Sequence, residues 1–451
     1  MPIRLFRGFL LVLLVSGPAA AQAPSDSGPL TLSAAVQQAL DQNPGILAAR
    51  SRAESSGHMV AAARSGLMPQ VNVSETFQNT TNPMWAFGTR LNQGAITAMD
   101  FDPDRLNDPE DISNFNTALT VDWPLYDGGK TIAAFSQARL QGEIGALALK
   151  RTEQEIISKT AQAYVGLLLA KENLAMIDRV LETARARLNV VQSRFDGGFV
   201  VKSDLLRAQV HIADLTQQRL SAESRVKVAA ATLNAAMGRP MDTALVLSDP
   251  FETCVEMEAG DPSPWIEKAK AFRPDLAQLR LAREVAARQV DVGRSGHLPH
   301  VMLNGAYEVN SESFDDTADS YTVGAMVRMN LFAGNGVSAA VRAAKADEKS
   351  ARALYEAQVQ GVEIEVRQAF FSAQSAWQRI AVARQAVALA EEALRIVSNR
   401  YAGGLMTMVD LLDAQTADQQ ARTLYFQALH DYKAARIQLA AAAGVIDANF
   451  Q

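Results

Sequence analysis

Five polar residues in two short clusters have spacings that a metal site could use. Asp100, Asp102 and Asp104 alternate like the first ligands of an EF-hand loop, but an arginine occupies the position where that loop needs glycine. His297 and His300 flank a proline, and no third candidate ligand stands nearby. A solvated acidic segment and the start of a strand explain these clusters better, so the sequence predicts no metal site.

Phosphate binding, thiol chemistry and nucleic-acid binding are equally weakly indicated. Gly129-Lys130-Thr131 matches the end of a phosphate-binding loop, yet Pro124 stands where its first glycine belongs. Cys254 is the single cysteine, which excludes an internal disulfide and thiolate zinc clusters. With 43 Lys and Arg against 49 Asp and Glu, the net charge is −6, whereas a general nucleic-acid binder needs a basic surface. We therefore predict no catalytic residue, no cofactor and no nucleic-acid partner.

Two glycine pairs and two acids are better suited to a mechanical role. Gly197-Gly198 and Gly403-Gly404 each follow a long helical pattern, and glycine adopts the positive φ that ends a helix. Each pair therefore predicts the turn of a helical hairpin. Asp410 and Asp413 share a face if the next segment is helical, although Thr407 and Asp410 also have the spacing of a capping box. Capping explains Asp410 and leaves Asp413 unexplained.

Heptad repeats precede both glycine pairs. Apolar residues that recur every seven positions, with many alanines, indicate coiled-coil packing of closely spaced helices. No proline interrupts the pattern from about Gly129 to Arg194, or its copy from about Val337 to Arg400. At 1.5 Å per residue, each segment predicts a helix of about 100 Å. One heptad row is Leu167, Leu174, Leu181, Leu188 and Phe195, and its copy is Ala373, Ile380, Val387, Leu394 and Tyr401.

Four segments of about ten residues alternate between apolar and polar side chains. They cover residues 70–77, 116–126, 300–310 and 320–332. The pattern is typical of transmembrane β-strands, but a half-buried soluble sheet produces the same alternation. The alternation alone leaves both interpretations open.

The second half of the chain repeats the first. Arg64–Pro69 matches Arg294–Pro299 at an offset of 230, and Arg194–Gly198 matches Arg400–Gly404 at an offset of 206. The change places about 24 extra residues in the first copy, which we expect to form a loop over about 78–114, extracellular if the strands cross a membrane. The predicted organisation is a first repeat over 22–247, a linker over 248–264 rich in Pro, Asp and Gly, and a second repeat over 265–451.

The first residues have the features of a secretory signal peptide. Arg4 and Arg7 precede the apolar run Phe9–Val15, and Ala19–Ala21 offers small residues for cleavage. The run is too short to span a bilayer as a helix. We predict a signal peptide over 1–21 and export from the cytoplasm.

Four strands are too few for a membrane barrel, because an open edge in lipid leaves backbone groups unsatisfied and single-chain barrels begin at about eight strands. Either the sheet is soluble or several chains share one barrel. Here the sequence resembles the TolC family of outer-membrane efflux proteins, over essentially the whole mature chain. The resemblance rests on Leu30–Ser33, Asn43-Pro44, the strand-to-helix junction Trp123–Gly129 and the two Gly-Gly breaks, in this order and in a duplicated chain.

The resemblance implies a fold that is α plus membrane β. In it, a homotrimer forms a periplasmic coiled-coil tunnel, continuous with a twelve-stranded β-barrel in the lipid of the outer membrane. It also implies docking to a periplasmic adaptor protein and an inner-membrane pump, so that the chain is a passive duct for efflux or type I secretion. The alternative is a periplasmic coiled-coil adaptor, which would normally carry one hairpin between compact β domains. The sequence does not specify the cargo.

The resemblance further implies roles at the hairpin tips. Asp410 and Asp413 match the aperture constriction, where threefold symmetry would gather six carboxylates and favour cations. Tyr401 and Asp204 match positions of the network that holds the aperture closed. The turns at Gly197, Gly198, Gly403 and Gly404 match the tips that meet the adaptor.

One position departs from the family pattern. Met406 stands where the archetype has an arginine that locks the gate, so the same ion pair cannot form. Arg194 and Lys202 are the candidate replacements.

Overall fold

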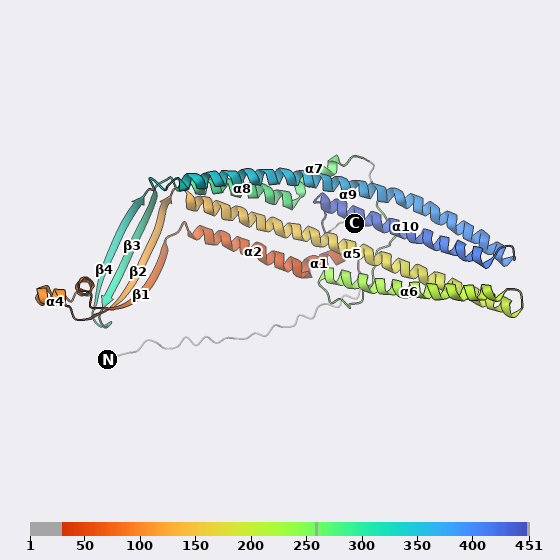
Figure 1. The fold of residues 1–451 in the computed structure, drawn as a ribbon, viewed down its shortest axis with the longest axis horizontal. Helices are drawn as coiled ribbons and strands as arrows, with labels where there is room; N and C mark the ends of the chain where they lie inside the picture. The colour runs from red at the N-terminus through yellow and green to blue at the C-terminus, as the bar shows by residue number, and fades with distance from the viewer. Residues whose placement is uncertain (1–28, 258–259, 449–451) are drawn as a thin grey trace.

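A computed structural model describes residues 29–257 and 260–448, and the predicted signal peptide lies outside them (Figure 1). The chain is mostly helical, with four strands gathered at one end. In chain order the elements are α1 (Leu32–Gln42), α2 (Pro44–Ser65), β1 (Gln70–Thr80), α3 (Pro83–Asn92), the 3₁₀ helix η1 (Ala98–Phe101), α4 (Pro103–Asn107), β2 (Ile112–Asp127), α5 (Lys130–Asp196), α6 (Lys202–Met237), α7 (Ser263–Phe272), α8 (Pro274–Ser295), β3 (His300–Ser311), β4 (Thr317–Arg328), α9 (Gly336–Ala402) and α10 (Met408–Ala442).

Two long helices set the length of the molecule. Helices α5 and α9 have 67 residues each, which at 1.5 Å per residue is about 100 Å. The sheet lies at one end of these helices and the turns of two hairpins lie at the other (Figure 1). The buried positions of α5 include Leu167 and Leu181 from the predicted heptad row. The fold class expected from the sequence is therefore confirmed.

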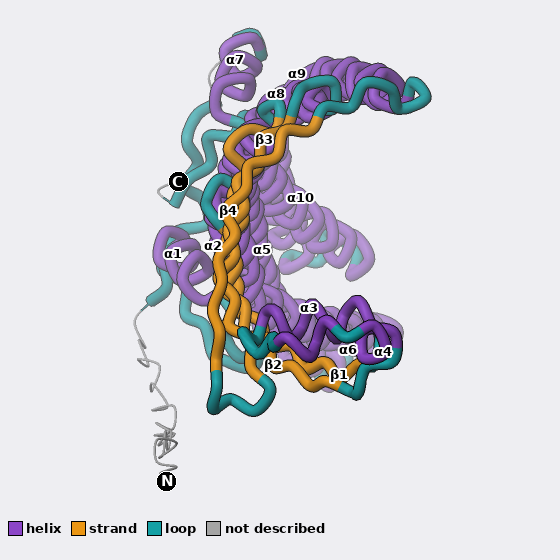
Figure 2. The backbone as a smooth tube through the Cα atoms, turned by 90° about the vertical axis from the view of Figure 1, so that its left-hand side faces the viewer, coloured by secondary structure: helices purple, strands orange, loops and turns teal. Residues whose placement is uncertain are grey.

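Shorter helices pack in pairs alongside the two long helices, and together they form a wall of helices. Helices α2 and α6 follow one another along α5, and α8 and α10 do the same along α9 (Figure 1). Viewed from the end that carries the sheet, the helices lie on an arc with one concave side (Figure 2). Among the described residues, none of the helices is both long and apolar enough to cross a membrane.

The four strands form one antiparallel sheet in the order β1-β2-β3-β4. One row across it is Val73, Leu119, Tyr307 and Tyr321, and the neighbouring row on the opposite face is Ser74, Ala118, Glu308 and Ser320. The sheet thus has one mainly apolar and one mainly polar face. The expected extension of the last strand to residue 332 is wrong. Strand β3 begins at His300, opposite Arg328, so later residues have no strand to pair with.

The insertion of the first copy is partly helical, which corrects the expectation of a loop. Asn82 caps α3 by accepting from the backbone N–H of Met84, and α4 and η1 follow. Gln93, just after α3, donates from Nε2 to the backbone oxygen of Ser113 at 2.8 Å and to Oδ1 of Asn114 at 2.9 Å. Asn114 in turn donates to Asn310 on the polar face of the sheet.

These contacts fold the insertion inward rather than away from the sheet. Helices α3 and α4 lie on the same side of the sheet as the hollow of the helical arc (Figure 2). The backbone of Gly94 approaches Ala318 of β4 so closely that a Cβ would lie 3.5 Å from the alanine methyl group. The insertion therefore lies against the polar face, at the end of the sheet away from the long helices.

The repeat is visible in two equivalent helix junctions. Helix α6 ends at Gly238, with φ +74°, against the turn between α1 and α2, and Asn43 of that turn donates to the carbonyl of Ala236 at 2.7 Å. The second copy uses a different side chain in the same place. Arg273, between α7 and α8, donates to the carbonyl of Ala442 at 2.9 Å. Both junctions satisfy carbonyls that the end of a long helix leaves without intrahelical partners.

Arg273 also places a buried positive charge among the packed helices. The residue is 3% exposed, and it donates to Asp275 at 2.6 Å and to Glu365 at 2.7 Å. Burial by itself raises the pKa of Asp275, but the hydrogen bond and charge of Arg273 outweigh burial and hold that pKa below its ordinary value. Three helices thus meet on one guanidinium group.

Replacing Arg273 tests this junction. We expect Arg273→Ala to lower the free energy of unfolding by about 2–4 kcal/mol, because it leaves two carboxylates and a helix-end carbonyl without their donor. The full decrease in the free energy of unfolding is expected at pH values above the ordinary Asp pKa of 3.8. The decrease becomes smaller as the pH falls through the lower pKa of Asp275 in the folded protein, where this carboxylate becomes protonated. Denaturant titrations at several pH values measure it. The exposed Arg280→Ala on α8 is the control, and equal stability of the two variants would contradict this account.

Replacing Gln93 tests how the insertion is held. Gln93→Ala removes two hydrogen bonds, worth about 1–2 kcal/mol together, so the insertion should open several-fold more often. We expect limited proteolysis within residues 81–111 to accelerate by that factor, while the helical circular dichroism stays unchanged. Asn92→Ala, one residue earlier and exposed, should cleave at the wild-type rate. Unchanged cleavage of Gln93→Ala would show that other contacts hold the insertion.

Candidate gate at the hairpin tips

The two hairpin turns have the same backbone geometry. In the first, the amide of Gly198 donates to the carbonyl of Phe195 at 2.9 Å and the amide of Phe199 donates to Arg194 at 2.8 Å. The second repeats this pattern with Gly404 and Leu405 as donors. Only the second glycine of each pair has positive φ, +77° at Gly198 and +73° at Gly404. Gly197 and Gly403 have φ of −80° and −82°, so one glycine of each pair supplies the positive φ that ends the helix.

The two hairpins pack against each other just behind their turns. Met408 and Leu411 of α10 are both 3% exposed and belong to one apolar cluster with Val191 of α5 and Leu205 and Ala208 of α6. Burial of each large apolar side chain contributes roughly 1.5–3 kcal/mol. The apolar cluster therefore holds the second hairpin against the first.

Asp410 and Asp413 lie in the exposed first turns of α10. Asp410 forms the predicted capping box: its carboxylate accepts from the hydroxyl of Thr407 at 2.6 Å and from the backbone amide of Thr407 at 2.9 Å. These hydrogen bonds, the hydroxyl first, lower the pKa of Asp410. Asp413 is exposed and makes no hydrogen bond or ion pair with the described residues. Capping therefore accounts for Asp410 and not for Asp413.

Tyr401 and Asp204 lie on facing hairpins but are not hydrogen bonded. The hydroxyl of Tyr401 is shielded from solvent and has no hydrogen-bond partner among the residues that the structure describes. Burial raises the pKa of Tyr401, the charge of Asp204 adds to this effect, and Arg194 opposes it. The two residues that the resemblance assigns to one network are thus electrostatic neighbours without a direct bond.

Arg194 is the cation that bridges the two hairpins. Its Nη2 donates to the backbone oxygen of Ala402 at 3.3 Å, on the other hairpin. Lys202 makes no such contact within the described part of the chain, and Met406 is partly buried. Of the two candidate replacements for the missing arginine, Arg194 therefore has the better geometry, although it binds a carbonyl rather than a carboxylate.

Three polar residues near the tips were missed from the sequence: Arg187, His211 and Gln415. They line a cavity between the hairpins. His211 falls on the same helix face as the buried residues Ala208 and Leu215, three before and four after it. A polar residue at an apolar position of the helical period was the signal that could have identified it.

Two of the aspartates in the acidic cluster that resembles a calcium loop cap short helices. Asp100 accepts from Thr97 at the start of η1, and Asp102 caps α4. The described residues contain no group of three or more His, Cys, Asp or Glu side chains placed to hold a metal ion.

The fold and the paired hairpins define the class: a protomer of a TolC-like outer-membrane channel. The family model "Outer membrane efflux protein" matches residues 35–239 and 265–445, which is most of the chain, in two segments that correspond to the two repeats. The chain therefore belongs to the outer membrane efflux protein family.

Individual relatives agree with this assignment. The alkaline protease secretion protein AprF of Pseudomonas aeruginosa is 25% identical over 452 residues, covering 98% of this chain and 88% of AprF. The outer membrane protein TolC of Vibrio cholerae is 22% identical, covering 91% and 89%. The crystal structure of the outer membrane protein VceC of Vibrio cholerae has a TM-score of 0.76 at 20% identity, covering 92% of this chain and 96% of VceC.

These similarities decide between the two classes that the sequence left open. The protein is an outer-membrane channel protein of the TolC family, and the periplasmic adaptor is not favoured. The relatives are channel proteins rather than enzymes, which agrees with the lack of a catalytic constellation in the sequence.

The glycine turns give a direct test of the tip geometry. Gly404→Ala places a Cβ in left-handed backbone, which costs about 1–2 kcal/mol, whereas Gly403→Ala at φ −82° should be nearly neutral. We expect the amide of Leu405 to exchange its hydrogen about tenfold faster in Gly404→Ala only. Hydrogen exchange read by mass spectrometry measures this, and equal rates in the two variants would refute the assignment of the turn.

Proposed function

We propose that the protein forms a homotrimeric duct from the periplasm to the exterior. In this duct the helices make a periplasmic tunnel, and the sheets of three chains close into one barrel in outer-membrane lipid. The duct is passive, and it works with a periplasmic adaptor and an inner-membrane pump in efflux or type I secretion. The secretion arm is supported by AprF and by the proteases secretion protein PrtF of Dickeya chrysanthemi, which is 24% identical.

The observation that carries the proposal is the open sheet. Strands β1 and β4 each have a partner on one side only within the described residues, so both edges present unpaired backbone groups. In lipid such groups are unsatisfied unless the sheet closes on copies of itself. Three chains supply twelve strands, enough for a closed barrel, whereas four strands are not. The curved array of helices is consistent with one third of a tube (Figure 2).

The gate of this duct is proposed to lie at the second hairpin. Three copies of Asp410 and Asp413 would place six carboxylates around the axis, at the end of the tube away from the sheet. Such a ring attracts cations and restricts other solutes. The tips at Gly197, Gly198, Gly403 and Gly404 are the proposed docking points for the adaptor, with Tyr401 and Asp204 at the contact between hairpins. Opening then requires Met408 and Leu411 of the second hairpin to separate from the apolar residues of the first hairpin that they pack against.

Planar-bilayer recordings of purified trimers test this gate. We expect the double variant Asp410→Asn and Asp413→Asn to lose cation selectivity and to be blocked by trivalent cations at least tenfold less strongly, because the ring loses its charge. Asparagine keeps a side-chain oxygen for the capping box, so the hairpin should still fold.

Glu182→Gln, exposed on α5, removes a charge remote from the ring and should leave conductance, selectivity and block unchanged. Unaltered selectivity and block in the double variant would reject the gate. A monomer that does not insert into bilayers would reject the duct itself.

A further inference from the structure

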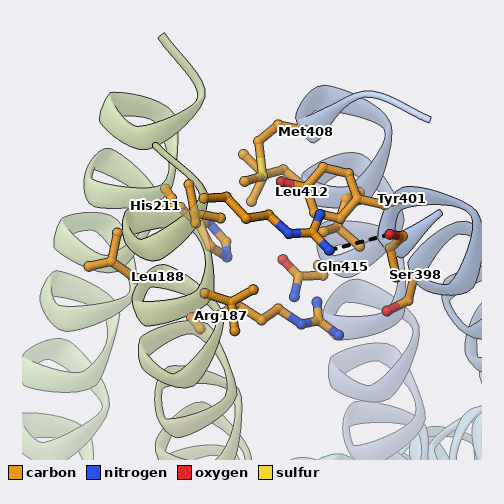
Figure 3. A pocket seen from close by; sticks show the side chains of 15 residues that line it. Arg187, Leu188, His211, Ser398, Tyr401, Met408, Leu412 and Gln415 are labelled. Atoms are coloured by element: carbon orange, nitrogen blue, oxygen red, sulfur yellow. Dashed lines mark hydrogen bonds between the residues drawn. The ribbon is translucent and has the colours of Figure 1, made fainter. Parts of the chain in front are cut away.

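A partly enclosed pocket between the two hairpins is lined by three polar groups that have no hydrogen-bond partner among the described residues. The pocket has a volume of about 170 Å³ and lies between α5 and α6 on one side and α9 and α10 on the other. A water molecule occupies about 30 Å³ of liquid, so the pocket is large enough for a small polyatomic ligand. Figure 3 shows Arg187 and His211 of one hairpin facing Tyr401 and Gln415 of the other.

Three polar atoms in this pocket lack partners. Arg187 Nη1, His211 Nε2 and Tyr401 Oη are shielded from solvent, and none has a hydrogen-bond partner among the described residues. Most buried polar side-chain atoms in proteins are hydrogen bonded, and a shielded donor left unpaired costs about 1–3 kcal/mol. Three such atoms from three helices in one pocket indicate a site built for a ligand rather than a packing defect.

The charge of the lining selects the sign of the ligand. Arg187 and Arg194 line the pocket together with His211, and no acidic residue does. Burial lowers the pKa of His211, and the charge of Arg187 contributes in the same direction while Asp214 opposes it. A neutral imidazole with its proton on Nε2 still donates a hydrogen bond. The pocket therefore offers a guanidinium charge and neutral donors, with no carboxylate among its lining residues.

We infer that this pocket binds a small oxyanion, held by Arg187, His211 and Tyr401. A guanidinium group presents parallel N–H donors that match two oxygens of a carboxylate or phosphate, and the tyrosine hydroxyl completes the contact from the opposite hairpin. Gln415, 9% exposed in α10, lies beside the site as a further donor. The anion is thus a phosphate or a carboxylate, bound between the two hairpins.

The position of the site gives the ligand a consequence for the gate. Arg187 and His211 belong to the first hairpin and Tyr401 to the second, so a bound oxyanion connects them. Such a ligand binds the closed arrangement better than a separated one and shifts the population toward it. This consequence rests on the proposed function, whereas binding itself does not.

Calorimetric titration of the purified full-length protein tests binding. The probes are inorganic phosphate and, separately, acetate, at constant ionic strength maintained with chloride. We expect saturable binding with one site per chain for at least one probe. Arg187→Gln should lower the affinity at least tenfold, and Tyr401→Phe, which removes only the hydroxyl, several-fold. Binding of phosphate alone assigns the site to phosphates, and binding of acetate assigns it to carboxylates.

The matched control is Arg185→Gln, on the same helix but exposed and outside the pocket, and it should bind like the wild type. No saturable binding of either probe, or equal affinity in Arg187→Gln and Arg185→Gln, would overturn the inference. Bilayer recordings separate the two proposals. Wild-type trimers should conduct without the probe and conduct less with it, whereas Arg187→Gln should not respond. Trimers that bind the probe but never conduct would reject the duct and leave the site standing.

Discussion

The structure depends on two places where a long helix ends inside the wall. Helices α6 and α10 stop midway along their long partners, and buried helix ends must have their last carbonyls satisfied. Asn43 performs this in the first copy and Arg273 in the second, with Gly238 and Gly444 allowing the backbones to approach. Because these junctions let two shorter helices line up end to end, the array of helices can extend about 100 Å with a side chain bonded to a terminal carbonyl at each helix end inside it. The hairpins at one end and the sheet at the other are placed by this arrangement.

The sheet imposes the second constraint. Its two open edges are incompatible with lipid in a single chain, so the proposed membrane function requires the proposed trimer. The insertion adds an asymmetry that the repeat lacks. Anchored by Gln93 to the polar face, it lies toward the hollow of the arc, so three copies would narrow the exit of a trimeric duct.

Patterns with a long period were the predictable part of this chain. Sixty-seven-residue helices repeat their heptad often enough to be recognised, and the tip glycines follow directly from where the heptads stop. Helices α3 and α4 are too short to show a period, although Asn82-Pro83 carries the start signal of α3 and Asp102-Pro103 that of α4. The end of β4 depends on where its partner β3 begins. The pocket could not be predicted, because Arg187 and Tyr401 are brought together by packing between two hairpins, which no spacing along the chain encodes.

The two hairpins share a backbone but have diverged in chemistry at their tips. At the offset of 206, Val201 stands where the second copy has the capping Thr407, and Arg207 stands where it has Asp413. Two polar residues of the pocket are also confined to the first copy, since Arg187 and His211 correspond to alanines. The two copies share one acid, because Asp204 stands at the position of Asp410. An acid at Arg207 as well would add three like charges to one end of a trimer, and their repulsion would oppose closure. The second acid, Asp413, lies on one hairpin and Arg187 on the other, which allows the same fold to serve as both the fixed and the moving part of the proposed gate.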